Sequence, residues 1–148
     1  VSAYEKDGFA VRPFLVKKLE SDDGRFVKAF SGKRFDRVVS ADTAQKMRTL
    51  MENVVLKGSG HLAKINHFTV GGKTGTAQKA MSNGRGYMKG HYIASFIGFA
   101  PLKDPAFVIY VIVDDPRGSI WGETVCGPVY KRVMEYCLRY FNVKPDML

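Results

Sequence analysis

Gly71-Gly72-Lys73-Thr74-Gly75-Thr76-Ala77 is the stretch around which the chain is organised. It follows a run of Phe, Thr and Val, residue types that favour a pleated strand. Because side chains of a strand alternate between faces, Thr74 and Thr76 present two hydroxyls on one face, about 7 Å apart. Lys73 adds a cation, and Gly75 leaves the backbone open to close approach. Two hydroxyls, a cation and an accessible N–H are suited to holding a carboxylate, a phosphate or a developing oxyanion.

Length and composition indicate one globular domain. The chain has 148 residues, of which 45% are hydrophobic and 25% are charged. The formal net charge is +9, but the basic residues are scattered and no run exceeds two. A nucleic-acid-binding protein more often clusters them on one element. We therefore interpret the charge as a solvated basic surface and expect no nucleic acid partner.

The chain opens mid-pattern, without an initiator Met or a signal peptide, and we interpret it as a piece of a longer polypeptide. Its longest apolar run, residues 106–113, is far shorter than the ~20 residues of a membrane-spanning helix. Cys126 and Cys137 are expected on one helix, ~16 Å apart along its axis, whereas a disulfide needs Cα atoms within about 7 Å. Neither these cysteines nor the three histidines have the spacing of a metal site, so no metal or cofactor is expected.

Apolar periodicity predicts two helices, over residues 41–57 and 124–141. Ser40 is a suitable N-cap for the first helix and Gly58 a suitable stop, while Pro128 suggests that the second begins close to it. The apolar face expected on the first helix consists of Ala44, Met47, Leu50, Met51, Val54 and Val55. The face expected on the second consists of Val125, Val129, Val133, Tyr136, Cys137 and Tyr140.

Sequence patterns typical of strands occur both before and after the first helix. A strand pair is expected within residues 9–30, with a turn at 21–24, and further strands at 68–77, 91–100 and 106–114. Residues 79–90 are polar, rich in glycine and aperiodic, so they are expected to form an exposed loop. Short links between the last three strands favour antiparallel neighbours. The pattern predicts an α+β fold in which helices pack on an antiparallel sheet.

The motif stretch resembles the Lys-Thr-Gly motif of penicillin-binding proteins and serine β-lactamases. The resemblance covers nearly the whole chain and is strongest to class B penicillin-binding proteins, the division and elongation transpeptidases of peptidoglycan synthesis. Ser95-Phe96-Ile97-Gly98-Phe99-Ala100-Pro101 resembles their Ser-Phe-x-Gly-x-x-Pro strand. The other matching segments, in family order, are residues 8–13, 38–44, 54–63, 72–78, 104–105, 115–116, 127–130 and 145–146.

The chain departs from the family pattern at two places, before the motif lysine and before the last helix, and neither departure touches the motif itself. Gly71-Gly72 stands where members often have Ala-Gly, and Gly122-Glu123 where they often have Gly-Gly. The family's nucleophile is the serine of a Ser-x-x-Lys motif, faced by a Ser-x-Asn motif. None of the eight serines of this chain has Lys three residues later or Asn two residues later. The resemblance therefore implies the C-terminal half of a transpeptidase domain, which lacks the nucleophile.

The resemblance also implies roles for individual residues. The hydroxyls of Thr74 and Thr76 would bind the terminal carboxylate of the substrate or of a β-lactam. The N–H of Thr76 would supply half of the oxyanion hole, and Gly75 would let the bound group approach the strand. Lys73 would hold the serine of the Ser-x-Asn motif and keep the site positive. Ile120-Trp121 occupies the place of an aromatic pair that forms an apolar wall at the site in some members.

The partners implied are a D-Ala-D-Ala stem peptide, β-lactams and the missing half of the domain. The family works at the extracytoplasmic face of the bacterial inner membrane, in cell division or cell shape, anchored by an N-terminal segment that this chain does not contain. Alone, the chain is expected to associate with itself through uncovered apolar faces.

Three alternatives are weighed against this interpretation. Gly72-Lys73-Thr74 imitates the end of a nucleotide-binding P-loop, but His67 stands where that loop needs glycine, and a strand pattern follows instead of a helix. A non-catalytic basic binding module is supported only by charge. A β-lactamase or penicillin sensor of the same superfamily is disfavoured by the downstream matches, but the deacylation machinery that separates these classes is outside the chain.

Overall fold

The computed structural model describes residues 8–11, 13–31 and 34–147. The chain divides into two compact units, Val1–Gln45 and Lys46–Leu148. Among the helices of the described residues, none combines the length and the hydropathy needed to cross a bilayer. The Lys-Thr-Gly stretch lies wholly in the second unit.

The first unit contains two small antiparallel pairs. Strand β1 (Phe9–Val11) pairs with β4 (Arg34–Arg37), and β2 (Lys18–Glu20) pairs with β3 (Phe26–Ala29). The β2–β3 hairpin lies where a hairpin was expected, but the first member of the expected pair, which would run unbroken from residue 9 to the turn at 21–24, is wrong. Pro13 lacks an N–H and follows β1, so the run is divided into two strands. Strand β4 was missed because Arg-Phe-Asp-Arg carries almost no strand signal.

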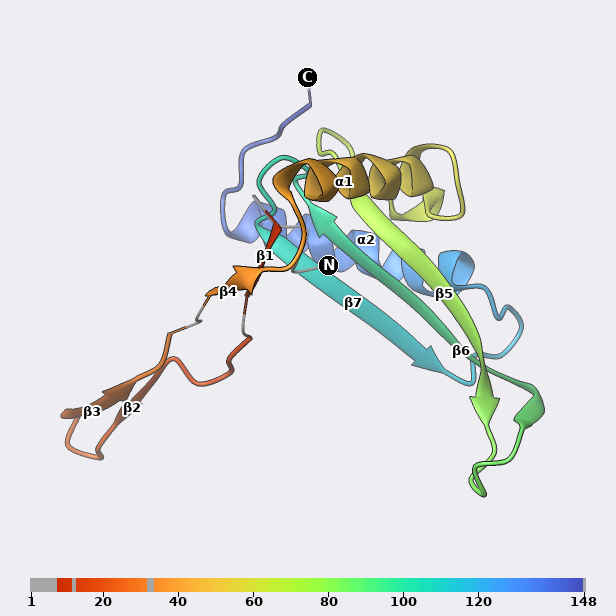
Figure 1. The fold of residues 1–148 in the computed structure, drawn as a ribbon, viewed down its shortest axis with the longest axis horizontal. Helices are drawn as coiled ribbons and strands as arrows, with labels where there is room; N and C mark the ends of the chain where they lie inside the picture. Colours follow the sequence, from red (N-terminus) through yellow and green to blue (C-terminus); the bar gives the residue numbers. More distant parts are fainter. Residues whose placement is uncertain (1–7, 12, 32–33, 148) are drawn as a thin grey trace. The chain divides into compact units, whose positions relative to one another are not determined.

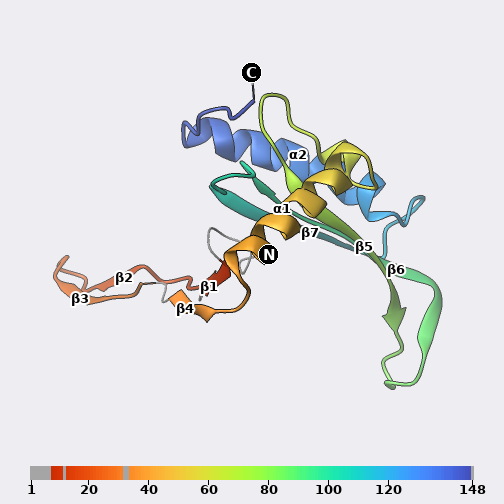
Figure 2. The same cartoon turned by 45° about the horizontal axis from the view of Figure 1, so that its top comes forward.

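The second unit is built on a three-stranded antiparallel sheet (Figure 1). Its order is β5 (Gly71–Ala80), β6 (Tyr87–Ala100) and β7 (Phe107–Asp114). Ladder pairing of β6 with β7 begins at Ile93, so the first part of β6 continues beyond β7, as Figure 2 shows. The loop expected over residues 79–90 is therefore wrong, and only 81–86 connect β5 to β6. Met81 N–H donates to the Gly86 carbonyl at 3.1 Å and closes this hairpin, a local backbone bond that side-chain polarity does not indicate.

Helix α1 spans Ala41–Leu56 and belongs partly to each unit. The Ser40 hydroxyl accepts a hydrogen bond from the Thr43 N–H at 3.1 Å, so Ser40 caps the helix as its residue type predicts. Met51 and Val55 are buried, whereas Leu50 is exposed and was wrongly placed on the buried face. A short 3-10 helix, η3 (His61–Ala63), follows and leads to β5.

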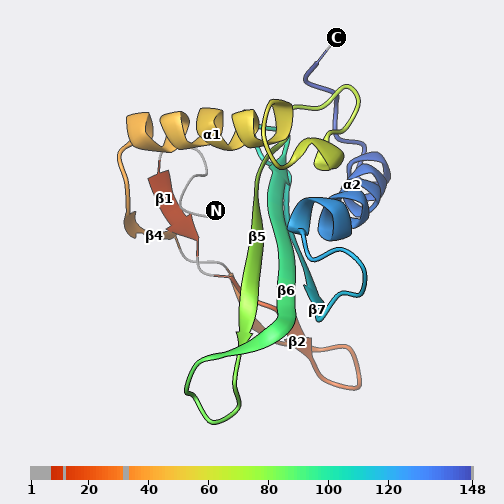
Figure 3. The same cartoon turned by 90° about the vertical axis from the view of Figure 1, so that its right-hand side faces the viewer.

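Helix α2 (Gly122–Tyr140) lies along one face of the sheet, as Figure 3 shows, and contacts β6 and β7. Its buried face consists of Gly122, Cys126, Gly127, Tyr130, Met134 and Leu138. The face expected from the sequence is wrong, because Val129, Val133, Tyr136 and Tyr140 are exposed. Both stripes are apolar at helical spacing, so periodicity alone cannot decide which one meets the sheet. The expected start near Pro128 is also wrong, since Pro128 lies inside the helix.

Tyr130 lies at the centre of the core, beneath the sheet. Its side chain is fully buried, and its ring meets that of Phe96 edge-on with centroids 4.8 Å apart. The hydroxyl has no hydrogen-bond partner among the described residues. Burial raises the pKa of Tyr130 well above its ordinary value, so the hydroxyl is a neutral, unsatisfied group.

Tyr130→Phe is expected to stabilise the protein by about 1 kcal/mol, because it removes a buried polar group that makes no bond. The measurement is the free energy of unfolding in urea. Tyr110→Phe is the matched control, since Tyr110 is 57% exposed on β7 and should give no change. A destabilised Tyr130→Phe protein would show that the hydroxyl has a partner outside the described residues.

Two ion pairs join the ends of the strands away from the motif. Lys79 Nζ lies 2.8 Å from Asp114 Oδ1, and His91 Nδ1 lies 2.8 Å from Asp115 Oδ2. The hydrogen bond from His91, more than any other contribution, holds the pKa of Asp115 below its ordinary value. The hydrogen bond to Asp114 raises the pKa of Lys79.

His91→Ala is expected to raise the pKa of Asp115 toward the ordinary carboxyl value of about 3.9. A depressed pKa in the folded state stabilises the protein above the unfolded pKa, and this contribution is lost as the pH falls through the folded pKa. The variant should therefore lose less stability below pH ~4 than the parent does. A carbon-13 NMR titration of the Asp115 carboxyl measures the shift. Lys89→Ala, which removes a nearby cation on β6, is the control and should leave that titration unchanged.

Candidate active site

The motif residues Lys73, Thr74, Gly75 and Thr76 lie within β5, which is an edge strand of the sheet among the described residues. In the ladder with β6, Lys73 faces Ile97, Gly75 faces Ser95 and Thr76 faces Ala94. Lys73 and Thr76 are exposed. Because β5 has a described neighbour on one side only, its other backbone edge is open to a ligand or another segment.

Glycine at position 75 has a steric basis. A Cβ built there would lie 2.5 Å from Ser95 Oγ on the neighbouring strand. A larger residue would have to displace that side chain, which lies across the ladder from the motif. The small residue keeps the two strands at normal ladder spacing and leaves the surface beside Lys73 clear.

Lys73 carries a positive charge that no carboxylate balances among the described residues. Its Nζ donates to the carbonyl of Thr74 at 2.7 Å, which holds the ammonium over the strand. No described Asp or Glu lies within ion-pair distance of it. The cation is therefore free to attract an anionic group or to donate to a second side chain.

Thr74 is oriented by a serine for which no role was predicted. Its Oγ1 lies 2.8 Å from the Oγ of Ser59, in the loop between α1 and η3. The bond joins residues fifteen apart in sequence. The signal that could have drawn attention to it is Gly58-Ser59-Gly60, because small residues around a hydroxyl allow two backbones to approach. Ser59 therefore belongs to the candidate site as an orienting residue.

Thr76 meets the start of α2. The N–H of Gly122 points to Thr76 Oγ1 at 3.4 Å, so the positive end of the helix dipole lies beside this hydroxyl. A Cβ on Gly122 would lie 2.2 Å from the Ser95 carbonyl oxygen and 2.6 Å from that of Gly75. The helix can begin this close to the sheet only because the residue is glycine.

The residues around this helix start complete the site. Glu123, in the first turn of α2, forms an ion pair with His61 of η3. Trp121 is 63% exposed, and Ile120 is partly buried. Trp121 therefore directly precedes Gly122, whose N–H meets Thr76, while no hydrogen bond joins Ile120 to the motif among the described residues. Among the described residues, no group of three or more potential metal ligands is found.

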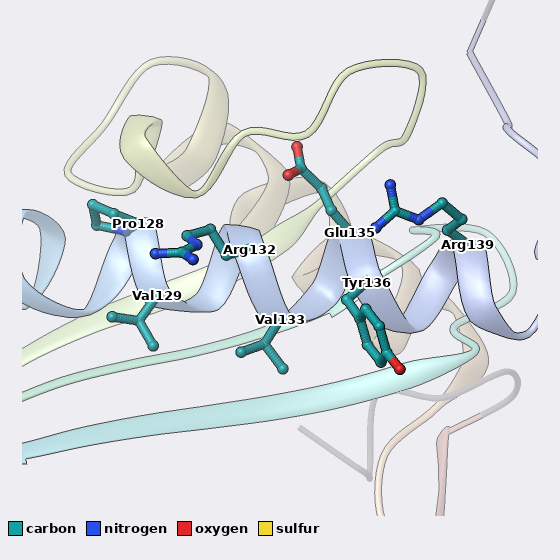
Figure 4. Close-up of a pocket in the computed structure, with 7 residues that line it drawn as sticks. All are labelled: Pro128, Val129, Arg132, Val133, Glu135, Tyr136 and Arg139. Carbon is teal, nitrogen blue, oxygen red and sulfur yellow. The ribbon is translucent and has the colours of Figure 1, made fainter.

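A groove on the outer side of α2 is separate from the motif. Figure 4 shows Val129, Val133 and Tyr136 on one side of the helix. Arg132, Glu135 and Arg139 are on the other side. The lining of the groove consists of Pro128, Val129, Arg132, Val133, Glu135, Tyr136 and Arg139. It contains none of the residues expected at the site, so the chemistry suggested by the motif does not extend to it.

A family model described as the penicillin binding protein transpeptidase domain matches residues 1–135 of the chain. The chain belongs to this family. The α+β fold class inferred from sequence is confirmed, because the structural neighbours are transpeptidase domains of penicillin-binding proteins. The resemblance to the class B members is confirmed by the curated relatives.

Two curated relatives of this transpeptidase-domain chain illustrate the match. Stage V sporulation protein D of Bacillus subtilis is 40% identical over 147 residues, which cover 98% of this chain and 22% of the relative. A probable peptidoglycan D,D-transpeptidase PenA of Neisseria flavescens is 42% identical over 111 residues, covering 74% of this chain and 27% of the relative. The chain thus spans about a quarter of the length of these relatives.

Solved transpeptidase domains show the same arrangement. The aztreonam complex of penicillin binding protein 3 from Mycobacterium tuberculosis superposes with a TM-score of 0.82 at 28% identity, covering 97% of this chain and 34% of that one. The D,D-transpeptidase domain from Eggerthella lenta gives a TM-score of 0.75 at 27% identity, covering 96% of this chain and 31% of that one. The chain therefore corresponds to about a third of each solved chain.

Proposed function

We propose that this chain supplies the substrate-binding strand of a D,D-transpeptidase that cross-links peptidoglycan stem peptides. The observation that carries the proposal is the open edge of β5, where an unbalanced ammonium lies beside two hydroxyls that neighbouring elements orient. Membership of the transpeptidase family supports it. Relatives named as peptidoglycan D,D-transpeptidases support the reaction class.

In the proposed reaction, a serine Oγ outside this chain attacks the penultimate D-Ala carbonyl of a stem peptide. The tetrahedral intermediate collapses to an acyl-serine, and the terminal D-Ala leaves with a proton on its new amine. The amine of a second stem peptide then attacks the acyl-serine, forms the cross-link and frees the serine. Covalent catalysis of this kind divides one difficult step into two easier ones.

This chain contributes binding and electrostatics to both steps. Thr74 and Thr76 donate hydroxyl hydrogen bonds to the substrate carboxylate, and Lys73 places a positive charge beside it. The N–H of Thr76 stabilises the developing oxyanion, a type of contact worth about 3 kcal/mol in the transition state. Trp121 and Ile120 form an apolar wall for the substrate. A β-lactam, which also combines an acyl carbonyl with an anionic group, binds in the same place.

The partner that completes the site is the rest of the transpeptidase domain, which carries the Ser-x-x-Lys and Ser-x-Asn motifs. The solved domains are about three times as long as the part that this chain matches, which supports that proposal. The whole protein works at the extracytoplasmic face of the inner membrane, anchored by a segment outside this chain.

Labelling with a fluorescent penicillin tests the proposal. The full-length protein is expected to form a stable covalent adduct, whereas this chain alone is expected to form none, because it lacks the nucleophile. Release of the adduct within seconds would indicate a β-lactamase instead. Covalent labelling of the chain alone, or no labelling of the full-length protein, would contradict the proposal.

A further inference from the structure

The C-terminal segment after α2 binds the residues that lead into β5. Asp146 Oδ1 accepts a hydrogen bond from the Thr69 N–H at 2.8 Å, and Asp146 Oδ2 accepts one from the Thr69 hydroxyl. The N–H groups of Asp146 and Met147 both donate to the His67 carbonyl at 3.2 Å. Side chain and backbone thus join two segments that are 77 residues apart in sequence.

Thr69 connects this contact to a third segment. Its hydroxyl donates to Asp146 and accepts a hydrogen bond from the N–H of Leu102 at 2.8 Å. Leu102 lies in the turn between β6 and β7. One threonine hydroxyl therefore links the C-terminal segment, the approach to β5 and the far turn of the sheet. We name the set formed by Asp146, Thr69, Leu102 and His67 the C-terminal clasp.

The approach to β5 needs such an anchor because the strand is rich in glycine. Gly71, Gly72 and Gly75 lie within five residues, and glycine loses more conformational freedom on folding than any other residue. The chain also turns sharply just before it, since His67 has a φ of +65°. Among the described residues, β5 is paired on one side only, so the ladder with β6 restrains it from one direction.

The glycines also make the strand sensitive to small displacements. A Cβ on Gly71 would lie 2.5 Å from the Phe99 ring, and one on Gly72 would lie 2.4 Å from the Phe96 ring. The backbone of β5 therefore rests directly on two aromatic rings, and Thr69 lies four residues before Lys73 in the same segment. An active site can lose on the order of 100-fold in rate when a group is displaced by 1 Å.

We propose that Asp146 is a positioning residue that acts through Thr69 to hold the Lys-Thr-Gly strand in its working place. The inference rests on the proposed function, since it assigns Asp146 a role in the same acylation. The hydrogen bonds of the carboxylate within the described residues go to Thr69 and not to Lys73, Thr74 or Thr76. Asp146 instead fixes the position of Thr74 and Thr76, the residues proposed to bind the anionic end of the ligand.

The test uses the full-length protein and measures two constants for a chromogenic β-lactam, the binding constant and the acylation rate constant. Asp146→Ala is expected to lower the second-order acylation constant on the order of tenfold, a fraction of the loss that 1 Å of displacement produces. Thr69→Val, which removes the linking hydroxyl, should lower it by a similar factor. Thr69→Ser, which retains the hydroxyl, should restore the parent value.

Val143→Ala is the control for a merely structural role. Val143 belongs to the same C-terminal segment and packs against the core, but no hydrogen bond joins it to Thr69 among the described residues. Its loss should lower the melting temperature without changing the acylation constant of the folded protein. The same pattern in Asp146→Ala, or a loss in Thr69→Ser as large as in Thr69→Val, would overturn the positioning role. If the parent protein itself is not acylated, the proposed function is contradicted. If the parent is acylated and only the variants behave otherwise than expected, the positioning role alone is overturned.

Discussion

Replacing Lys73 by alanine is expected to abolish acylation of the full-length protein, with a loss on the order of 1,000-fold in rate. The ammonium makes one hydrogen bond within the described residues, to the Thr74 carbonyl, and its charge is not balanced by a described carboxylate. In the proposed function, its removal would take positive charge from the place where the anionic substrate binds, and a donor from the serine of the Ser-x-Asn motif.

The fold should not change in this variant, because Lys73 is exposed and packs against nothing in the core. The melting temperature is therefore expected to match that of the parent. Lys79→Ala is the matched control. Lys79 lies on the same strand and pairs with Asp114 at 2.8 Å. Because exposed ion pairs contribute little, its loss should change stability only slightly and leave acylation unchanged.

Rates are measured by stopped-flow labelling with a fluorescent penicillin at saturating and subsaturating concentrations. A Lys73→Ala protein that acylates at the parent rate would remove Lys73 from the mechanism. Equal losses in Lys73→Ala and Lys79→Ala would show that net positive charge along β5 matters more than the position of one amine.

Gly122→Ala is expected to destabilise the protein by about 3 kcal/mol and to impair the site at the same time. The added Cβ would lie 2.2 Å from the Ser95 carbonyl oxygen and 2.6 Å from the Gly75 carbonyl oxygen. Both atoms belong to the backbone of the β5–β6 ladder and cannot rotate away as a side chain can. The start of α2 must then move off the sheet, and the Gly122 N–H loses its approach to Thr76.

Gly127→Ala on the same helix is the control. A Cβ at Gly127 would lie 3.2 Å from Leu62 Cβ, a contact that a shift of a few tenths of an ångström relieves. Alanine favours the interior of a helix over glycine by about 1 kcal/mol, so this variant is expected to be nearly neutral or slightly more stable. Urea unfolding measures both variants. A Gly122→Ala protein as stable as the parent would show that α2 does not rest on the ladder.

The sequence by itself determined the local structure and the chemistry of the motif. Ser40 and the polar turn residues marked element ends, because a cap or a turn depends on residues only a few positions apart. The strand character of β5 and the alternation that places Thr74 with Thr76 follow from side-chain type and a period of two. The ordered matches along the chain implied the transpeptidase family, which the family model confirms for residues 1–135.

Only the tertiary structure decided which face of α2 is buried, because the helix carries two stripes at helical spacing and the close contact of Gly122 with the sheet selects the one that contains the glycines. It also brought Ser59 to Thr74, Gly122 to Thr76 and Asp146 to Thr69, across 15, 46 and 77 residues. No local pattern records such pairs, since each bond depends on where two separately formed elements meet.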